Sequence, residues 1–475
     1  MSGAAAENAR TLAALLGVTE DEATTLLDKR ILVSADAGGR RLALQITRLL
    51  ERTFTAVDSE PGAEDKYAAE VVIAAASRRA PDAVPVVFVG ILPDEVVVDL
   101  VRVDGATEAT CHELILFIGA CYAAAATTKL ALPLLPLRFT SMSVSAAALL
   151  GEDAPVLRQA IDLGSSHLAG AGAIGNAFVC ALASLDVSGE LTVCDPDVVS
   201  AGNLNRCLLF DDIHVGQKKA EVLCKVGQGL CARLDFTPFP SRLENFAKAP
   251  DGRTFGRLIV GVDSRRGRRG LQLEFPGEVY DASTTGIEEV VLHFNRLPFS
   301  TACMSCVYHH DESESSRERH IAEVLGVTVA DVRENWVSAS AAHRICARYP
   351  SLLPDRVERE AYDSLFKSLC GQGVLKTEGG RHVLAPFAFV SALAGALLAI
   401  ELARRLWKRD ATAPFNYWRL SPWGAPVARL RAMLPARIGC EACGNAVYRE
   451  VAQQLWGKGD EVFAEHHDRR GPRPR

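Results

Sequence analysis

The sequence lacks a surplus of positive charge. Its 52 lysine and arginine residues stand against 58 aspartate and glutamate residues, which gives a net charge of -6 and a pI near 6.0. This balance predicts no nucleic-acid partner, because such partners select strongly basic surfaces. The basic residues 469–475 at the C-terminus are typical of a disordered tail.

A secretory signal and a full membrane span are also missing from the pattern. Residues 1–10 contain no basic stretch followed by an apolar one, so we expect a cytoplasmic protein. Residues 384–400 carry no charge, but this run is short, contains Pro386 and Gly395, and continues into Glu401. A buried helix of a large α/β domain fits it better than a transmembrane helix, so no membrane partner is predicted.

The cysteine content does not support a disulfide scaffold. The chain has 13 cysteines, an odd number, in 475 residues, and several of them lie in apolar segments. A reducing cytoplasm fits this distribution, with a few cysteines binding metal or doing chemistry. The length predicts two or three domains, and a composition of 48% hydrophobic and 23% charged residues is ordinary for a globular protein.

The first 150 residues show alternating strand and helix patterns. The predicted strands are residues 30–35, 70–75, 84–89 and 95–101, and the predicted helices are residues 5–16, 39–52 and 113–126. Gly38 and Gly39 follow the first strand, where a nucleotide-binding loop would lie, but the full glycine pattern is absent. We therefore predict an α/β lobe without a catalytic signature.

The second half of the chain alternates more regularly. Strands are predicted at residues 166–168, 191–194, 257–262, 278–281 and 289–295, and a helix at residues 176–185. This alternation predicts a parallel sheet with helices on both faces. Residues 312–381 differ because they are charged and helical, and we interpret them as an inserted lobe.

A glycine loop follows the strand that ends at residue 168. Its residues are Gly170, Ala171, Gly172, Ala173, Ile174 and Gly175. The first glycine permits a tight turn, the second lets the backbone approach a phosphate, and the third lets helix and strand pack closely. Asp195 lies twenty residues after the last glycine, a position that suits hydrogen bonds to ribose hydroxyls. Dehydrogenases carry the same loop, so the loop alone predicts a nucleotide and no particular reaction.

The residues after Asp195 add phosphate chemistry. Asp197 completes an Asp-x-Asp pair. Asn203 and Arg206 belong to an Asn-Leu-x-Arg run, and Lys219 ends a Gly-Gln-x-Lys run. An enzyme that cleaves ATP needs such cations, because charge builds on the α-phosphate and on the departing pyrophosphate. An NAD-dependent oxidoreductase has no role for them.

Together, the glycine loop, the Asp-x-Asp pair and these two runs resemble the superfamily of the ubiquitin-activating enzymes. This superfamily includes the ThiF-type sulfur-carrier adenylyltransferases of thiamine and molybdopterin synthesis. The four elements occur in family order at family-like spacing; the resemblance covers residues 155–307 and 385–447, and residues 1–150 only loosely. It implies ATP-dependent adenylation of the C-terminal carboxylate of a small partner protein.

The resemblance also implies a role for each motif residue. Asp195 would bind the ribose, and Asn203 and Arg206 would contact the phosphates. Lys219 would stabilise the charge of the transition state, and Asp263, after the strand at 257–262, would hold Mg²⁺.

Two positions depart from the family pattern. Ser264 stands where asparagine usually follows the metal-binding aspartate, and Cys207 stands where glutamine usually follows the arginine. Both changes concern fine geometry, because the neighbouring charges are kept. Arg268 fits an arginine that the family carries shortly after the aspartate. The alternative for residues 265–269 is a solvated arginine surface.

Two Cys-x-x-Cys pairs predict a zinc site. Cys303 with Cys306 and Cys440 with Cys443 supply four thiolates, the ligand set of a closed tetrahedral Zn²⁺ site. Either pair alone would also fit buried or redox-active cysteines. Together they match the structural zinc of the same superfamily.

A cysteine nucleophile is predicted for the step after adenylation, because many members of the superfamily pass the acyl group to a cysteine as a thioester. The candidates outside the metal pairs are Cys370 and Cys346. Glycines flank Cys370, which indicates an exposed loop, and Pro386 with a long apolar helix follows as in the family's crossover loop. Cys346 lies in a helical pattern and is interpreted as a packed or half-buried thiol. Cys370 is preferred, and the absence of cysteine catalysis stays open.

The predicted architecture is an α/β fold with two Rossmann-like adenylation lobes, which would form a pseudo-dimer within one chain. Residues 1–150 form the degenerate, inactive lobe, and residues 151–307 and 386–450 form the two parts of the active domain. Residues 308–385 are the inserted catalytic-cysteine region and crossover loop, and residues 451–475 are a C-terminal helix and flexible tail.

The predicted function is the activation of a ubiquitin-like protein by ATP and Mg²⁺, for transfer to a conjugating enzyme. The composition is compatible with a high-GC bacterium, where relatives of this shape belong to antiphage conjugation operons, so a role in antiviral defence is expected. Two alternatives stay open: a sulfur-carrier adenylyltransferase of thiamine, molybdopterin or cysteine synthesis, and a non-catalytic scaffold that binds a ubiquitin-like protein. Retention of the motif cations and aspartates counts against the scaffold.

Overall fold

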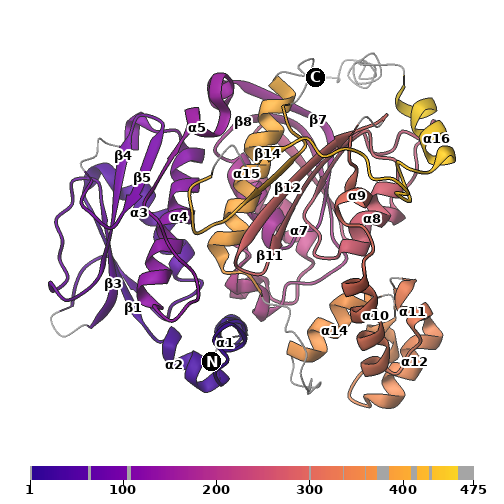
Figure 1. Ribbon diagram of the computed structural model, residues 1–475, viewed down its shortest axis with the longest axis horizontal. Helices are drawn as coiled ribbons and strands as arrows, with labels where there is room; N and C mark the ends of the chain where they lie inside the picture. The colour runs from indigo at the N-terminus through magenta and orange to yellow at the C-terminus, as the bar shows by residue number, and fades with distance from the viewer. Residues whose placement is uncertain are drawn as a thin grey trace, which may run out of the picture.

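The computed structural model describes residues 3–62, 66–103, 108–298, 301–334, 336–358, 360–371, 385–407, 414–426 and 431–457. Two β-sheets lie side by side, each with its own helices, and a further group of helices lies beyond the second sheet (Figure 1). The strand order is β2-β1-β3-β4-β5-β6 in the first sheet and β14-β13-β12-β11-β10-β7-β8-β9 in the second.

The first sheet and its helices come from the N-terminal third of the chain. Its strands are β1 (Arg30–Ala35), β2 (Ala56–Asp58), β3 (Tyr67–Ile73), β4 (Val86–Leu92), β5 (Glu95–Asp99) and β6 (Met142–Ser145). Its helices are α1 (Gly3–Leu16), α2 (Glu20–Leu27), α3 (Arg40–Leu50), α4 (Glu113–Ala131) and α5 (Ala146–Leu150). Strands β1 to β4 are parallel, whereas β5 and β6 are antiparallel. The predicted strands and helices are all present, with ends shifted by a few residues.

The second sheet is mixed, so the prediction of a parallel sheet is only partly correct. Its strands are β7 (Ala160–Ala169), β8 (Asp186–Cys194), β9 (Leu234–Phe239), β10 (Arg257–Val260), β11 (Glu278–Thr285), β12 (Glu289–Arg296), β13 (Tyr417–Leu420) and β14 (Arg431–Ala432). Strands β7 to β11 are parallel to one another, whereas β12 pairs antiparallel with β11, β13 with β12 and β14 with β13. Only three residues join β11 to β12, and so short a connection permits a hairpin but no crossover.

Long helices join the two sheets into one hydrophobic core. The helices around the second sheet are α6 (Ala173–Leu182), α7 (Lys219–Leu230), α8 (Arg265–Leu273), α9 (Met304–Val307), α15 (Ala388–Trp407) and α16 (Ala446–Trp456). Helix α15 contacts both α6 and α4, so it lies between the sheets (Figure 1). A Cβ on Gly395 would lie 2.5 Å from the Phe178 backbone nitrogen, so glycine is needed for α15 to approach α6 so closely. One continuous cluster of buried apolar side chains therefore spans both halves of the chain.

Helix α4 is long and apolar enough to cross a membrane, but 89% of its apolar window is buried inside the fold. It packs on α3, on α15 and on the first sheet. This burial is typical of a core helix. The prediction of a buried helix at residues 384–400 is likewise confirmed by α15, whose side chains are buried along most of its length.

A group of helices leaves the second sheet after α9 and has its own apolar core. These helices are α10 (Glu312–Leu325), α11 (Val329–Arg333), α12 (Ala339–Arg348), α13 (Pro354–Val357) and α14 (Tyr362–Gly371). They form the lower right part of Figure 1, next to α8. The predicted helical character of residues 312–381 is present up to Gly371, and residues 372–384 lie outside the described residues. Helix α16 ends at Trp456, and the rest of the predicted C-terminal segment also lies outside them.

Candidate functional site

The glycine loop lies between β7 and α6, and its first and last glycines are required by the backbone. Gly170 has a φ of 101°, which a side chain would oppose. A Cβ on Gly175 would lie 2.1 Å from the Gly170 carbonyl oxygen. Gly172 is the N-cap of α6, so the positive end of the helix dipole opens at the loop. The predicted helix at 176–185 therefore starts three residues earlier, directly at the loop.

A buried asparagine, which sequence reasoning did not identify, holds this loop. The Asn176 amide nitrogen donates to the carbonyl oxygens of Ala171 at 2.9 Å and Gly172 at 3.0 Å. Its carbonyl oxygen accepts from the Leu209 backbone N–H at 3.1 Å. Asn176 thus ties the glycine loop to the segment that follows Arg206. A polar amide within an otherwise apolar helix was the available signal.

Asp195, Asp197 and Lys219 form one charged group at the carboxyl end of β8. The Asp195 carboxylate accepts the backbone N–H groups of Ala171 at 2.7 Å and Asp197 at 2.9 Å. Lys219 Nζ lies 2.7 Å from Asp197 Oδ2, and its backbone N–H donates to the Asp197 carbonyl. The structure therefore brings together residues that are 22 to 24 positions apart.

Burial and neighbouring opposite charges shift the pKa values of Asp195 and Lys219 in opposite directions. Burial raises the pKa of the Asp195 carboxyl above its ordinary value, although Lys219 counteracts part of this rise. Burial alone would lower the pKa of Lys219, but the carboxylates of Asp195 and Asp197 outweigh it and raise that pKa. Lys219 therefore stays protonated throughout the neutral range.

Asn203 lies on a short 3₁₀ helix, Ala201–Asn205, that contacts α1, and Arg206 directly follows this helix. Asn203 Oδ1 accepts the Ser200 N–H at 3.2 Å and so caps this helix. Arg206 Nη1 donates to Asn205 Oδ1 at 2.7 Å, and Glu7 lies 4.0 Å from it.

Helix α1 brings a second cation to this position. Arg10 pairs with Glu7 at 2.5 Å, so one carboxylate lies beside both Arg10 and Arg206. No motif in the N-terminal segment indicated this contribution.

Cys207, which replaces the usual family glutamine, is buried among the charged groups of the site. Burial raises the pKa of its thiol, and the charges of Arg206, Lys219 and Asp195 all act on it. Arg206, Lys219 and Asp195 therefore all lie near this thiol. The neutral thiol fills space there without adding charge.

Asp263 follows β10, the neighbour of β7, and lies at the same carboxyl edge. A Cβ on Gly170 would lie 3.0 Å from the Gly261 backbone, which shows how closely the two strand ends approach. Ser264 is the N-cap of α8, and its side chain accepts the Gly267 N–H at 3.1 Å. The serine that departs from the family pattern therefore has a local structural role.

The arginines of α8 correct one prediction. Arg268, which fits an arginine of the family, pairs with Asp281 at 2.8 Å in the core and is 3% exposed. Arg266 and Arg269 are also buried, so a solvated arginine surface is wrong for all but Arg265.

Arg266 and Arg269 join α8 to the inserted helices. Arg266 pairs with Glu318 at 2.9 Å, and Arg269 binds Glu314 through two nitrogens at 2.7 and 2.9 Å. Both carboxylates belong to α10, so these two arginines hold the inserted helices against α8.

We expect Arg268→Leu to lower the free energy of unfolding by about 3–5 kcal/mol, because it leaves the buried Asp281 carboxylate without its cation. Urea denaturation measures this loss. The matched control is Arg265→Leu, which removes an exposed pair with Asp311 and is expected to cost less than about 1 kcal/mol. Equal losses in the two variants would contradict the buried ion pair.

The inserted helices also contact the segment after β9, at the carboxyl edge of the second sheet, which the sequence did not indicate. The Arg242 guanidinium lies 3.1 Å from the centre of the Trp336 ring. Trp336 bridges to Ala361, and the Val337 N–H donates to the Glu360 carbonyl. Burial raises the pKa of the Glu360 carboxyl; the charge of Asp197 adds to this shift, and Arg242 and Lys219 oppose it.

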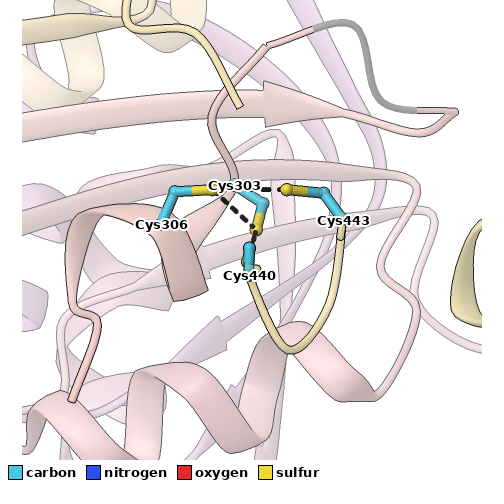
Figure 2. A group of neighbouring side chains, drawn as sticks. All are labelled: Cys303, Cys306, Cys440 and Cys443. Carbon is cyan, nitrogen blue, oxygen red and sulfur yellow. Dashed lines mark hydrogen bonds between the residues drawn. The ribbon is translucent and has the colours of Figure 1, made fainter. Parts of the chain in front are cut away.

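The four predicted metal-binding cysteines converge, although 137 residues separate the two pairs (Figure 2). The Sγ distances are 3.8 Å for Cys303–Cys306, 3.6 Å for Cys303–Cys440 and 3.2 Å for Cys306–Cys443. All four side chains are buried, and the Arg437 N–H donates to Cys306 Sγ. Such a compact, buried thiol cluster can hold a metal ion.

Of the two candidate nucleophiles, Cys370 differs from its predicted backbone structure and Cys346 agrees with it. Cys370 lies in the last turn of α14, so the prediction of a loop is wrong for its backbone; its side chain lies outside the described part of the chain. Cys346 is partly buried in α12, as predicted, and burial raises the pKa of its thiol.

Comparisons with known proteins agree with this geometry. A sequence profile of the ThiF family matches residues 146–441, and a profile described as the E1 N-terminal domain matches residues 1–145. The "Uncharacterized protein y4jF" of Sinorhizobium fredii (strain NBRC 101917 / NGR234) is 29% identical over 262 residues, which cover 51% of this chain and 49% of that protein. The "Ubiquitin-activating enzyme E1 2" of Arabidopsis thaliana is 40% identical over 78 residues, 16% of this chain and 7% of that protein.

The chain thus spans about half the length of the first relative and a small part of the second. The solved structure of E. coli MccB with ATP covers 61% of this chain and 70% of that chain, with 14% identity and a TM-score of 0.36, too low to add to the assignment. The ThiF profile covers more than half of the 475 residues. On this match, the chain belongs to the ThiF family, within the superfamily of the ubiquitin-activating enzymes.

Proposed function

We propose that this protein adenylates the C-terminal carboxylate of a ubiquitin-like protein with ATP. The observation that carries the proposal is the meeting of the glycine loop, Asp195, Lys219 and Arg206 at one edge of the second sheet. A carboxylate oxygen of the partner would attack the α-phosphorus, and pyrophosphate would leave with the electrons of the broken P–O bond. The products are an acyl-adenylate and pyrophosphate.

Each charged group has a task in this step. The N-terminus of α6 and the loop N–H groups suit the phosphates, since they present positive partial charge. Asp195 is oriented by two backbone N–H groups for the ribose hydroxyls. Asn203, Arg206 and Lys219 would contact the phosphates, where they would stabilise the charge that grows on the leaving pyrophosphate.

Asp263 would hold the Mg²⁺ that accompanies ATP. Its carboxylate offers the hard oxygen ligand that this ion prefers, at the same edge as the glycine loop. Magnesium supplies charge neutralisation at the phosphates when it is bound.

The four-cysteine cluster would hold Zn²⁺ as a structural ion. Tetrahedral coordination with Zn–S bonds of about 2.3 Å requires sulfur atoms roughly 3.8 Å apart. The described Sγ distances of 3.2 to 3.8 Å approach this spacing. The Arg437 N–H bond to Cys306 resembles the outer-shell support that thiolate sites commonly have.

The test is ATP–pyrophosphate exchange with candidate ubiquitin-like proteins. Exchange that depends on the partner's free C-terminus supports adenylation. Absence of exchange with the authentic partner would contradict it and favour the scaffold alternative. Exchange without a later thiol-sensitive adduct would favour a sulfur-carrier adenylyltransferase. The proposed setting is bacterial antiviral defence, and infection of cells that carry or lack the gene tests it.

We expect Cys370→Ser to abolish a thiol-sensitive adduct between this protein and its partner while pyrophosphate exchange continues. The reason is that the thiolate attacks only after the acyl-adenylate has formed and AMP can leave. A non-reducing gel measures the adduct, which would then pass to a conjugating enzyme. Cys346→Ser is the control and is expected to keep the adduct, since burial raises the pKa of that thiol and disfavours its reactive form. An adduct that persists in Cys370→Ser would assign the nucleophile elsewhere.

A further inference from the structure

Two buried asparagines link the N-terminal segment to Arg206. Asn205 Nδ2 donates to Asn8 Oδ1 at 2.9 Å, and Asn205 Oδ1 accepts from Arg206 Nη1 at 2.7 Å. At the other end, Asn8 Nδ2 donates to the Arg52 carbonyl at 2.6 Å. Asn8 is 3% exposed and Asn205 is fully buried. A chain of three hydrogen bonds therefore runs from α1 and the end of α3 to the predicted phosphate-binding arginine.

This chain of hydrogen bonds has only one possible direction. A backbone carbonyl can only accept, so the Arg52 oxygen requires the nitrogen of the Asn8 amide. The Asn8 oxygen then faces Asn205 and requires its nitrogen, which leaves the Asn205 oxygen for Arg206. A guanidinium can only donate, so it matches that oxygen. Both ends of the chain thus select the same orientation of the two amides.

Arg52 also holds the segment on the other side of Arg206. Its guanidinium donates to the carbonyl oxygens of Leu204 at 2.8 Å, Phe210 at 3.1 Å and Leu208 at 3.3 Å. Asp211 Oδ1 lies 3.3 Å from Arg52 Nη2. The same residue therefore receives the Asn8 hydrogen bond through its backbone and fixes residues 204–211 through its side chain.

These hydrogen bonds fix the direction of the Arg206 guanidinium. The two hydrogen bonds described for this group, to Asn205 and to the Gly202 carbonyl at 3.3 Å, both use Nη1. The guanidinium is planar, so fixing one nitrogen against two acceptors also fixes the plane and the direction of its other N–H groups. A free arginine would lose rotamer entropy when it binds a phosphate, and a side chain held beforehand avoids much of that loss.

We infer that Asn8 is a positioning residue for nucleotide binding: through Asn205, the N-terminal lobe orients Arg206 toward the phosphates. This inference rests on the proposed function, in which Arg206 contacts ATP. It also gives a physical task to a lobe that lacks a glycine signature of its own. The N-terminal lobe supplies the buried Asn8 oxygen that holds Asn205, and the second lobe supplies the Arg206 cation.

Calorimetric titration with ATP and with adenosine tests the inference without a protein partner. We expect Asn8→Ala to weaken ATP binding roughly tenfold and to leave adenosine binding within twofold, because adenosine has no phosphate for Arg206. The control is Thr11→Val, on the same helix. Thr11 is 4% exposed and its hydroxyl donates to the Ala385 carbonyl at 3.3 Å, so it takes no part in the hydrogen bonds from Asn8 to Arg206. We expect it to lower the melting temperature but to leave both affinities within twofold.

The double variant Asn8→Ala/Arg206→Ala separates positioning from general damage. If Asn8 acts through Arg206, the double variant binds ATP no more weakly than Arg206→Ala alone. Additive losses, or equal losses for ATP and adenosine in Asn8→Ala, would overturn the inference. If the wild-type chain binds ATP but shows no partner-dependent exchange, adenylation fails and the positioning role stands. A wild-type chain that binds no ATP contradicts both.

Discussion

Replacement of Lys219 by alanine is expected to slow ATP–pyrophosphate exchange about 10²- to 10³-fold, the scale seen when one preorganised charge is removed from a transition state. Lys219 is 9% exposed and lies 2.7 Å from Asp197. Its loss removes a cation and leaves the carboxylates of Asp195 and Asp197 uncompensated beside the phosphates. The expected effect is therefore larger than the loss of one contact.

The neighbouring lysine is the control for this experiment. Lys218 donates to the Pro196 carbonyl at 2.9 Å and is partly exposed. Lys218→Ala removes the same charge from the same segment and is expected to change the exchange rate less than about threefold. Because the carboxylates raise the pKa of Lys219, its titration is not expected to limit exchange between pH 6 and pH 9. A Lys219→Ala rate within threefold of wild type would remove this residue from the proposed mechanism.

Loss of the metal ion is expected to cost the most stability. Purified protein should contain one zinc ion per chain, measured by elemental analysis. Structural zinc sites contribute about 10 kcal/mol or more of apparent binding free energy, so Cys440→Ser is expected to lower the melting temperature by about 10 °C or more. Removal of the zinc ion from the wild-type protein with a chelator should also lower the melting temperature.

The zinc effect has a structural basis beyond the ligands. The cluster joins the start of α9 to the segment before α16. Helix α16 in turn donates from Tyr448 to the Gln272 carbonyl of α8 and from Trp456 to the Phe275 carbonyl. Without the ion, these two distant segments keep only their apolar contacts and hydrogen bonds. Cys346→Ser is the control, since its thiol lies in α12 and its loss should leave the zinc content unchanged. Full zinc content and an unchanged melting temperature in Cys440→Ser would contradict the site.

The patterns that are local in the sequence predicted the structure well. The glycine loop and the apolar alternation placed β7, α6 and β8, because turn geometry and side-chain period act within a few residues. The two cysteine pairs predicted their own convergence, because a tetrahedral site needs both. The local patterns did not predict the burial of side chains whose partners are distant in the sequence. The composition of α8 indicates a solvated arginine surface, and yet Arg266 and Arg269 are buried, because Glu318 and Glu314 of α10 pair with them.

The sequence by itself predicted a nucleotide site and placed the chain in the superfamily of the activating enzymes, because the motif residues on which both inferences depend lie within one run, from Gly170 to Lys219. Only the tertiary structure decided what surrounds that run. Arg206 meets Asn205, which meets Asn8, and Trp336 of the inserted helices covers Arg242. These contacts join residues up to about two hundred positions apart. No local preference encodes such pairs, because they exist only after both sheets and the inserted helices have packed.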